Sequence, residues 1–279
     1  MLRSLFSGIS GLRANQTMLD VTGNNIANAN TVGFKASTTV FQDTLSQVMR
    51  GAGAAGATGG GTNPIQVGLG VQVAATRGNF NQGSAQVTGS ATDLMIQGDG
   101  MFVLGSGADR VYTRAGAFTW DEAGTLVSPS GKAVQGYAPG DAGGTLVDIN
   151  LDALAASLPA GVEMTSYSIG SDGVLRGTFS DDVQRDIAIV AVADFTNPAG
   201  LERVGETAFR ASANSGAPEF GVAGQGSRGD LMGGTLEMSN VDLSAEFTNL
   251  ILAQRGFQAS SRVITTSDQV LEELVNIKR

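Results

Sequence analysis

The chain has 279 residues, with 26 acidic and 17 basic side chains and a formal net charge of −9, which argues against binding to nucleic acid or to an anionic membrane surface. It contains no histidine and no cysteine. This excludes histidine-based catalysis, Cys-His nucleophiles, disulfides, and metal sites built from imidazole or thiolate. Abundant glycine and only 15% charged residues indicate short strands joined by tight turns. We therefore expect a β-rich protein that is not an enzyme and holds no cofactor or metal ion.

The first segment, residues 1–33, carries apolar residues in a heptad pattern. This spacing predicts an amphipathic helix of about 26 residues, roughly 40 Å long at 1.5 Å per residue. Gly33 is expected to end or interrupt the helix. The first residues lack the continuous apolar block of a secretory signal. The apolar residues of the pattern are Leu5, Ile9, Leu12, Leu19 and Ile26.

Four asparagines lie near the end of this predicted helix, namely Asn24, Asn25, Asn28 and Asn30. Two interpretations are open. The helix could fray there, because asparagine tolerates left-handed backbone geometry. Alternatively, the side-chain amides could bond the backbone of adjacent elements without introducing charge.

Residues 34–66 are expected to form a connector. Its stretch from Gly51 to Gly61 consists almost entirely of glycine and alanine. Such a segment buries too little surface to offset its ordering entropy. We therefore predict a flexible loop within this connector.

Residues 67–235 are predicted to form a β-rich domain. Val67, Leu69, Val71 and Val73 alternate with glycine or polar residues, which is typical of a half-buried strand. The segment 141–161 is the natural boundary between two groups of strands. Tyr112 and Trp120 are expected in the core. Further strands are predicted at residues 93–97, 101–104, 110–113, 117–120, 125–127, 166–169, 174–179 and 187–193.

Three short motifs could carry chemistry but are better explained as turns. Asp181-Asp182 lies between two strand patterns, which favours a hairpin turn. Asp172-Gly173 lacks the other ligands of a calcium loop, and Gly98-Asp99-Gly100 lacks the lysine of a phosphate-binding loop. Arg114 and Arg255 have weakly charged surroundings. Each is either an ordinary surface residue or an interface contact.

The last segment, residues 236–279, carries a second heptad pattern of apolar residues. This pattern predicts a helix from about Val241 to Ile277. Asn240 and Asp242 are candidate N-caps. The two terminal helices either pack on a globular core or pair as a coiled coil that buries a second face against other subunits. Polar residues at seam positions, such as Gln16, Gln254 and Ser261, favour the second interpretation. The apolar residues of this seam are Leu243, Phe247, Leu250, Phe257, Ile264 and Leu271.

The predicted fold class is α+β, with long N- and C-terminal helices forming a coiled-coil-like domain and a β-rich domain inserted between them. Two other functional classes compete with a self-assembling structural protein. A carboxylate-dependent glycosidase needs two acids across a cleft, and no acids in the sequence are convincingly paired. A binding module such as an adhesin would use the β region as its recognition face.

Several motifs resemble those of the bacterial flagellar rod and hook protein family. They occur in the family's order over nearly the whole chain, and Tyr112 to Phe118 and Asn214-Ser215-Gly216 resemble landmarks of its middle part. The terminal signatures are carried by Asn24, Asn25, Ala27, Asn28, Gly33, Phe34 and Lys35 at one end and by Asn240, Val241, Gln254 and Arg255 at the other.

The resemblance implies a structural subunit that self-assembles into a hollow tube, with the paired terminal helices lining the channel. Val241-Asp242-Leu243 and Asn197 to Leu201 favour the flagellar hook, the flexible joint that transmits torque from rod to filament. The alternative is the distal rod of the basal body. The short chain and the glycine- and alanine-rich segment after Gln47 favour that alternative.

The resemblance also implies the partners and the location. The partners would be copies of the chain itself in a helical polymer, together with other rod, hook-cap and hook–filament junction proteins and the flagellar export apparatus. No nucleic acid and no direct membrane insertion are expected. The subunit would reach the flagellum, outside the cell, by flagellar type III export without a cleaved signal peptide.

Overall fold

The computed structural model describes residues 2–54, 60–141, 143–151, 164–181 and 183–277. The chain divides into two compact units. The first comprises Met1–Ala27, Ser37–Asn79 and Val241–Arg279. The second comprises Asn28–Ala36 and Phe80–Asn240. Residues 67–79, which the sequence analysis assigned to the β-rich domain, thus group with the helices, and residues 28–36 group with the β strands.

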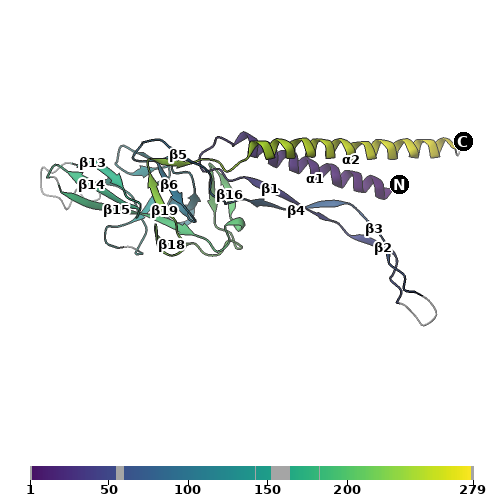
Figure 1. The fold of residues 1–279 in the computed structure, drawn as a ribbon, viewed down its shortest axis with the longest axis horizontal. Coiled ribbons are helices and arrows are strands. Elements are labelled where there is room, and N and C mark those ends of the chain that lie inside the picture. The colour runs from purple at the N-terminus through teal and green to yellow at the C-terminus, as the bar shows by residue number, and fades with distance from the viewer. Residues whose placement is uncertain (1, 55–59, 142, 152–163, 182, 278–279) are drawn as a thin grey trace. The chain divides into compact units, whose positions relative to one another are not determined.

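Two long helices form the main part of the first unit. They are α1 (Leu2–Ala27, 26 residues) and α2 (Leu243–Ile277, 35 residues). They lie side by side and run in opposite directions (Figure 1). The α+β class, with a helix at each end of a β-rich middle, is therefore confirmed.

The helices approach each other most closely along a line of small residues. A Cβ added at Gly8 would lie 3.1 Å from Cγ1 of Ile264, and one added at Gly11 would lie 2.8 Å from Oγ of Ser260. Further along, a Cβ at Gly256 would lie 2.5 Å from Oδ1 of Asn15. Small residues let the two backbones come close together, as Gly and Ser do in other tightly packed helix pairs.

The heptad residues flank this line of small residues. Leu243 and Phe247 are 44% and 50% exposed. A coiled-coil packing of the seam stays a prediction. The other members of the two heptad series are half-buried, namely Leu5, Ile9, Leu12, Leu19, Ile26, Leu250, Phe257, Ile264 and Leu271.

The ends of the helices differ from the predicted ones. Helix α1 ends at Ala27, well before Gly33, so Gly33 does not terminate it. Helix α2 is capped by Asp242, whose Oδ1 accepts hydrogen bonds from the N–H groups of Ser244 (2.8 Å) and Ala245 (3.2 Å). Asn240 is not the cap, because its Oδ1 accepts a hydrogen bond from the N–H of Ala36 instead.

Asn25 decides between the two interpretations of the asparagine-rich segment. Its side chain is fully buried. Its Nδ2 donates to the carbonyl of Ser37 at 2.7 Å, and its Oδ1 accepts from the N–H of Ser37 at 3.0 Å. The amide thus bonds the backbone of the following strand at both of its polar groups, as the second interpretation required.

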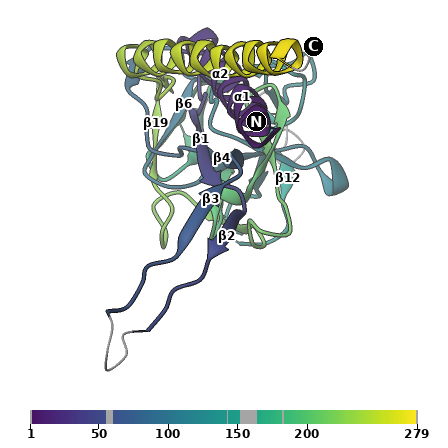
Figure 2. The same ribbon diagram turned by 90° about the vertical axis from the view of Figure 1, so that its right-hand side faces the viewer.

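The expected connector is a long two-stranded hairpin, drawn clearly in Figure 2. Strand β1 (Ser37–Asp43) pairs with β4 (Val71–Gly78), and β2 (Ser46–Arg50) pairs with β3 (Ile65–Gly68), all antiparallel. The single strand predicted over residues 67–73 is broken at Gly70, whose φ of +131° lies outside the usual range of L side chains. Residues 55–59 of the predicted flexible loop lie outside the described residues.

The second unit contains a sheet of ten strands. Seven follow one another in the order β12-β11-β15-β7-β8-β17-β16. Of the other three, β14 and β18 pair with β15, and β13 pairs with β14. Two-stranded ladders join β5 to β20, β6 to β19 and β9 to β10. Short 3₁₀ turns with described bounds include Gly107–Asp109 and Pro198–Gly200. The strands are β5 (Ala85–Val87), β6 (Leu94–Gln97), β7 (Met101–Leu104), β8 (Val111–Thr113), β9 (Thr119–Trp120), β10 (Leu126–Val127), β11 (Gln135–Tyr137), β12 (Val147–Asp148), β13 (Met164–Ile169), β14 (Val174–Phe179), β15 (Gln184–Asp194), β16 (Glu202–Gly205), β17 (Ala208–Arg210), β18 (Glu219–Val222), β19 (Asp230–Gly233) and β20 (Thr235–Glu237).

Strand β15 is the centre of this sheet. It pairs with β14 from one predicted strand group and with β7 from the other, so both groups share one sheet. The predicted boundary at 141–161 lies partly outside the described residues. The apolar run of β15 is continuous because both faces are covered: Val190 packs into one hydrophobic cluster and Ile189 into another. Tyr112 is buried as expected, whereas Trp120 is only partly buried.

Asp172 and Asp181 lie in turns, as the sequence predicted, whereas Gly98-Asp99-Gly100 is a bent link in which Asp99 forms an isolated β-bridge with Arg228. Asp181 lies between β14 and β15 and accepts a hydrogen bond from the N–H of Val183 at 3.1 Å, while Asp182 lies outside the described residues. Asp172-Gly173 joins β13 to β14, and Gly98-Asp99-Gly100 joins β6 to β7. Among the residues that the structure describes, no three acidic side chains are grouped as a metal site would require. Within the same residues, neither helix combines the length and the hydrophobicity needed to span a membrane.

The line of small residues predicts that Gly256→Ala destabilises the helical unit. The added methyl group would displace the Asn15 side chain, which donates to the carbonyl of Gly11 at 2.8 Å. Overpacking of this kind costs about 1–3 kcal/mol. This exceeds the gain of up to about 1 kcal/mol that alanine brings through helix propensity, because moving Asn15 also breaks its hydrogen bond to Gly11. Thermal unfolding followed by far-ultraviolet circular dichroism should show a lower midpoint for the variant.

Gly23→Ala is the matched control, because a Cβ at Gly23 meets no atom within 4 Å. Alanine there should stabilise α1 by up to about 1 kcal/mol through helix propensity alone. A rise in the midpoint for both variants would contradict close packing between the helices.

Candidate functional site

Three segments that are far apart in the sequence meet in the second unit. They are residues 28–36, which follow α1, the turn at 113–116 after β8, and residues 235–240, which precede α2. Each contains residues that the sequence analysis singled out as motifs. Their charged side chains form one buried cluster of Lys35, Arg114 and Glu237.

Lys35 and Glu237 form the centre of this cluster. Both side chains are fully buried, and Nζ of Lys35 lies 2.7 Å from Oε1 of Glu237. The ammonium group also donates to the carbonyl of Asn81 at 2.8 Å. Oε1 of Glu237 accepts a further hydrogen bond from the N–H of Gly83 at 2.8 Å. Buried charges are tolerated when they are paired and hydrogen-bonded in this way.

Arg114 supplies the second cation of the cluster. Its Nη1 lies 3.4 Å from Oε2 of Glu237 and donates to the carbonyl of Ile96 at 3.3 Å. Its Nη2 donates to the carbonyl of Gly98 at 2.6 Å. The expectation that Arg114 is a surface or interface residue is therefore wrong, because its side chain is 5% exposed.

Burial lowers the pKa of both cations, Lys35 and Arg114. Desolvation is the main cause that lowers the pKa of Lys35, and the charge of Arg114 lowers it further, whereas Glu237 raises it. Desolvation likewise lowers the pKa of Arg114 against the opposing charge of Glu237. Glu237 is thus the carboxylate that raises the pKa of both cations against desolvation, with Asp99 and Asp194 adding to its effect on Arg114.

Main-chain contacts tie the two connecting segments together. The N–H of Gly33 donates to the carbonyl of Glu237 at 2.8 Å, and Oδ1 of Asn240 accepts from the N–H of Ala36 at 2.8 Å. Nδ2 of Asn240 donates to the carbonyl of Asn81 at 2.9 Å. Gly33 has a φ of +67°, and a Cβ there would lie 2.4 Å from the N atom of Ala115. Only glycine satisfies both the backbone conformation and this close approach.

Arg203 contacts the connecting segment of residues 28–36. Its guanidinium lies 5.0 Å from the ring centre of Phe34 and 5.7 Å from that of Phe209. Its Nη2 donates to the carbonyl of Lys35. The family-motif residue Phe34 is thereby buried under a cation–π contact.

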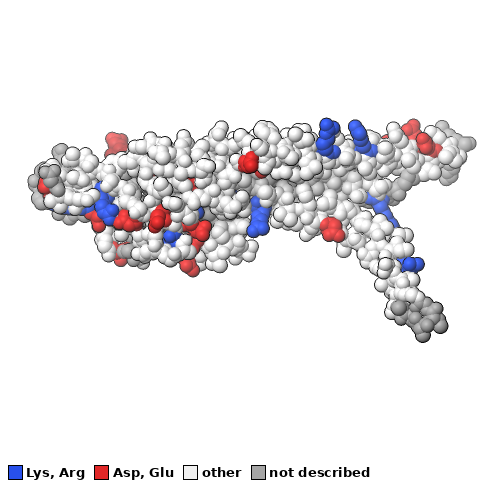
Figure 3. Space-filling model, in the orientation of Figure 1, with Lys and Arg blue, Asp and Glu red and all other residues white. Residues whose placement is uncertain are grey.

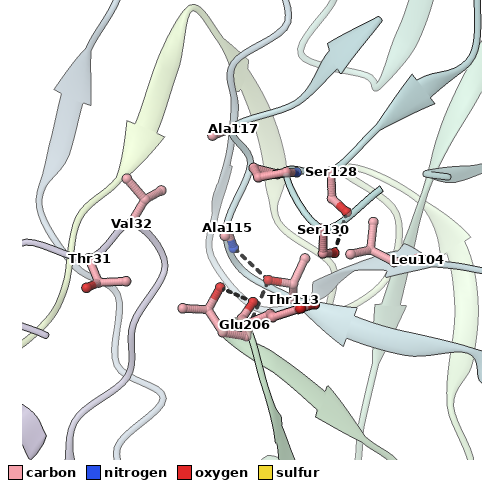
Figure 4. A pocket seen from close by; sticks show the side chains of 11 residues that line it. Thr31, Val32, Leu104, Thr113, Ala115, Ala117, Ser128, Ser130 and Glu206 are labelled. Atoms are coloured by element: carbon pink, nitrogen blue, oxygen red, sulfur yellow. Dashed lines mark hydrogen bonds between the residues drawn. The ribbon is translucent and has the colours of Figure 1, made fainter. Parts of the chain in front are cut away.

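An apolar cavity of about 450 Å³ lies in the same unit (Figure 4). Its wall includes Val32 of the first connecting segment. Thr113 Oγ1 accepts from the N–H of Ala115 at 3.0 Å and donates to the carbonyl of Thr207 at 3.1 Å. Among the described residues, Glu206 is the one acidic side chain in the wall. The described wall thus pairs this acid with no second carboxylate and no basic side chain, which general acid–base or nucleophilic catalysis would require.

The other motif residues are spread over the helices and their ends. Arg255 is exposed on α2, where its Nη1 lies 3.4 Å from Oε1 of Gln258. Asn24, Ala27 and Gln254 are also exposed, whereas Asn28 and Val241 are half-buried. The heptad residues and these motif residues are therefore not gathered into one site.

The sequence analysis missed Glu237, Asn81 and Arg203 as members of this cluster. One signal was available. Lys35 is one of only three lysines and lies in the otherwise uncharged stretch from Thr31 to Thr39, and Glu237 is the only charged residue between Leu231 and Asn240. Lone charges in uncharged segments point to burial with a partner, but nothing local identified which partner.

Three family models match different parts of the chain. The flagella basal body rod protein model matches residues 5–35. The flagellar hook protein FlgE/F/G D1 domain model matches residues 95–177. The flagellar basal body rod FlgEFG protein C-terminal model matches residues 232–277. The first and third matched ranges include Lys35 and Glu237, respectively, and the second includes Arg114.

Curated relatives align with the whole chain. The flagellar basal-body rod protein FlgG of Bacillus subtilis (strain 168) is 45% identical over 280 residues, which cover all of both chains. FlgG of Caulobacter vibrioides is 34% identical over 97% of both chains. The flagellar hook protein FlgE of Borreliella burgdorferi is 30% identical over 441 aligned positions, again covering all of both chains. The chain therefore belongs to the flagellar rod and hook protein family, structural components of the bacterial flagellum that are not enzymes.

Proposed function

We propose that this chain is a subunit of the distal rod of the flagellar basal body rather than of the hook. The observation that carries the proposal is the 45% identity to a rod protein over the full lengths of both chains. The hook relatives are 30% and 27% identical. The expectation of a hook subunit, drawn from short motifs, is therefore less well supported than its alternative.

Chain length supports the same choice. The alignment with the rod protein of B. subtilis covers 280 positions, whereas those with the two hook proteins extend over 441 and 463. With 279 residues, this chain lacks long segments that the hook relatives contain. The glycine- and alanine-rich segment that favoured a rod subunit lies in this chain within the hairpin of β1 to β4, which follows α1 in sequence.

We further propose that the subunit assembles with copies of itself through the apolar faces of its terminal helices. Several large apolar side chains of α2 are between 41% and 81% exposed. Much of the surface in Figure 3 is uncharged, so covering it would desolvate few charges. Repetition of one such heterologous contact builds an open helical polymer. The exposed apolar residues of α2 are Leu243, Phe247, Ile251, Leu252, Val263, Val270, Leu274, Val275 and Ile277.

The rod assignment predicts where the protein lies in purified hook–basal bodies. Antibodies against the β unit, viewed by immunoelectron microscopy on partly disassembled particles, should label the straight rod and leave the curved hook unlabelled. Cells that lack the protein should build no hook, because the hook would have no rod to continue from. Label along the curved hook would reject the rod assignment in favour of the hook.

The assembly surface predicts that Leu252→Asp blocks polymerisation and leaves the subunit folded. Leu252 is 63% exposed, so aspartate there meets water in the free subunit. In a covered interface the same charge would be unpaired, at a cost of several kcal/mol. Cells producing the variant should be non-motile, while the purified protein keeps the parent's circular dichroism and melting temperature.

Gln269→Glu is the matched control, since it adds the same charge to α2 at an exposed polar position. It should assemble almost normally. Motile cells with Leu252→Asp would show that this face of α2 is not an assembly surface.

A further inference from the structure

We propose that the cluster of Lys35, Glu237 and Arg114 is a latch that closes in a fixed order. The C-terminal connecting segment, residues 235–240, docks on the β unit first. The N-terminal connecting segment, residues 28–36, docks only after Glu237 is in place. The inference concerns how the free subunit folds and does not depend on the choice between rod and hook.

The first step of the argument is that Lys35 depends on Glu237. Among the described residues, the structure pairs the Lys35 ammonium with a single carboxylate, that of Glu237. Its other acceptor is the neutral carbonyl of Asn81. Because the side chain is fully buried, docking of Lys35 without Glu237 would leave a buried positive charge without a counter-charge. That state is strongly disfavoured.

Glu237 does not depend on Lys35 in the same way. Its Oε2 faces Arg114, which belongs to the β unit itself and is held there by the carbonyls of Ile96 and Gly98. Its Oε1 also accepts from the N–H of Gly83. If Lys35 is absent, Glu237 therefore keeps both a cation and a main-chain donor.

The main-chain contacts show the same asymmetry. The C-terminal segment has its own attachment, because β20 pairs with β5 and the N–H of Met238 donates to the carbonyl of Ser84 at 2.9 Å. The N-terminal segment instead uses the C-terminal one as acceptor for two of its N–H groups: Gly33 donates to the carbonyl of Glu237 and Ala36 to Oδ1 of Asn240, both at 2.8 Å. The one printed contact in the other direction, from the N–H of Asn240 to the carbonyl of Phe34, is longer at 3.4 Å. The N-terminal segment also contacts β16, where Arg203 donates to the carbonyl of Lys35. This contact brings another positive charge and therefore supplies no counter-charge for Lys35.

Two single variants of the full chain test the order of docking. Glu237→Gln keeps the shape and an acceptor oxygen but removes the negative charge. Lys35→Met removes the ammonium and keeps much of the apolar stem. Hydrogen exchange of residues 28–36 and 235–240 reports the docking of each segment. In Glu237→Gln, the rate of amine labelling at Lys35, relative to Lys132, gives a second measure. Fluorescence of Trp120, the only tryptophan, checks that the β unit stays folded.

The latch predicts opposite outcomes for the two variants. In Glu237→Gln, labelling of Lys35 should rise roughly 100-fold over the parent, and exchange of residues 28–36 should accelerate to a similar extent. In Lys35→Met, exchange of residues 235–240 should stay within about threefold of the parent, because the strand pair and Arg114 still hold that segment.

Equal loosening of residues 235–240 in both variants would overturn the fixed order, as would unchanged labelling of Lys35 in Glu237→Gln. If Glu237→Gln loses the Trp120 fluorescence of the folded β unit, that variant cannot be interpreted, and the test rests on hydrogen exchange in Lys35→Met. Retained protection of residues 235–240 would then support the order, and its loss would refute it.

Discussion

The carboxylate of Glu237 is fully buried, and this one charge constrains the second unit more than any other group. It must be balanced by cations that are themselves buried, and the structure supplies Lys35 and Arg114 from two other segments. Lys35 is 202 residues away in sequence. Bringing the three together fixes the path of both connecting segments, the positive φ of Gly33, and the tight contact of Gly33 with the turn after β8.

Local sequence patterns predicted those helices and strands whose burial leaves a regular spacing of apolar residues in the sequence. The heptad spacing identified both helices, and the unbroken apolar run of β15 identified the central strand, because burial on both faces leaves that signature. Strands of three or four residues, such as β16 to β20, carry too few positions for an alternation to appear. In the hairpin of β1 to β4, only part of one arm was predicted, from the alternation of Val67, Leu69, Val71 and Val73. Strands β1 and β2 were missed, because their side chains are largely exposed and show no such alternation.

The site was harder to predict than the fold. The motifs named Gly33, Phe34, Arg114 and Asn240, but not that they meet, because pairing across the chain leaves no local pattern. Asn240 and Asp242 were both candidate helix caps, since both closely precede α2. Asp242, with a carboxylate oxygen that accepts from two N–H groups, fills that position better. Asn240 was then available to bond the other connecting segment.

The choice between hook and rod shows a further limit of motif reading. Short terminal signatures belong to the architecture that both kinds of subunit share, so they identify the family more readily than the member. What separates the rod and hook relatives is the length of the segments between the signatures and the identity over the whole chain.

The line of small residues between α1 and α2 has a genetic consequence. Gly8, Gly11 and Gly256 let the helices come close together, while several large apolar residues of α2, such as Phe247, Ile251 and Leu252, remain exposed on the helix. If the exposed apolar residues of α2 form the assembly surface proposed above, enlarging one of these glycines would shift α2 and misplace that surface. Alleles that abolish assembly would then map to glycines between α1 and α2 as well as to the surface itself, and second-site suppressors would shrink the opposing residue on the other helix.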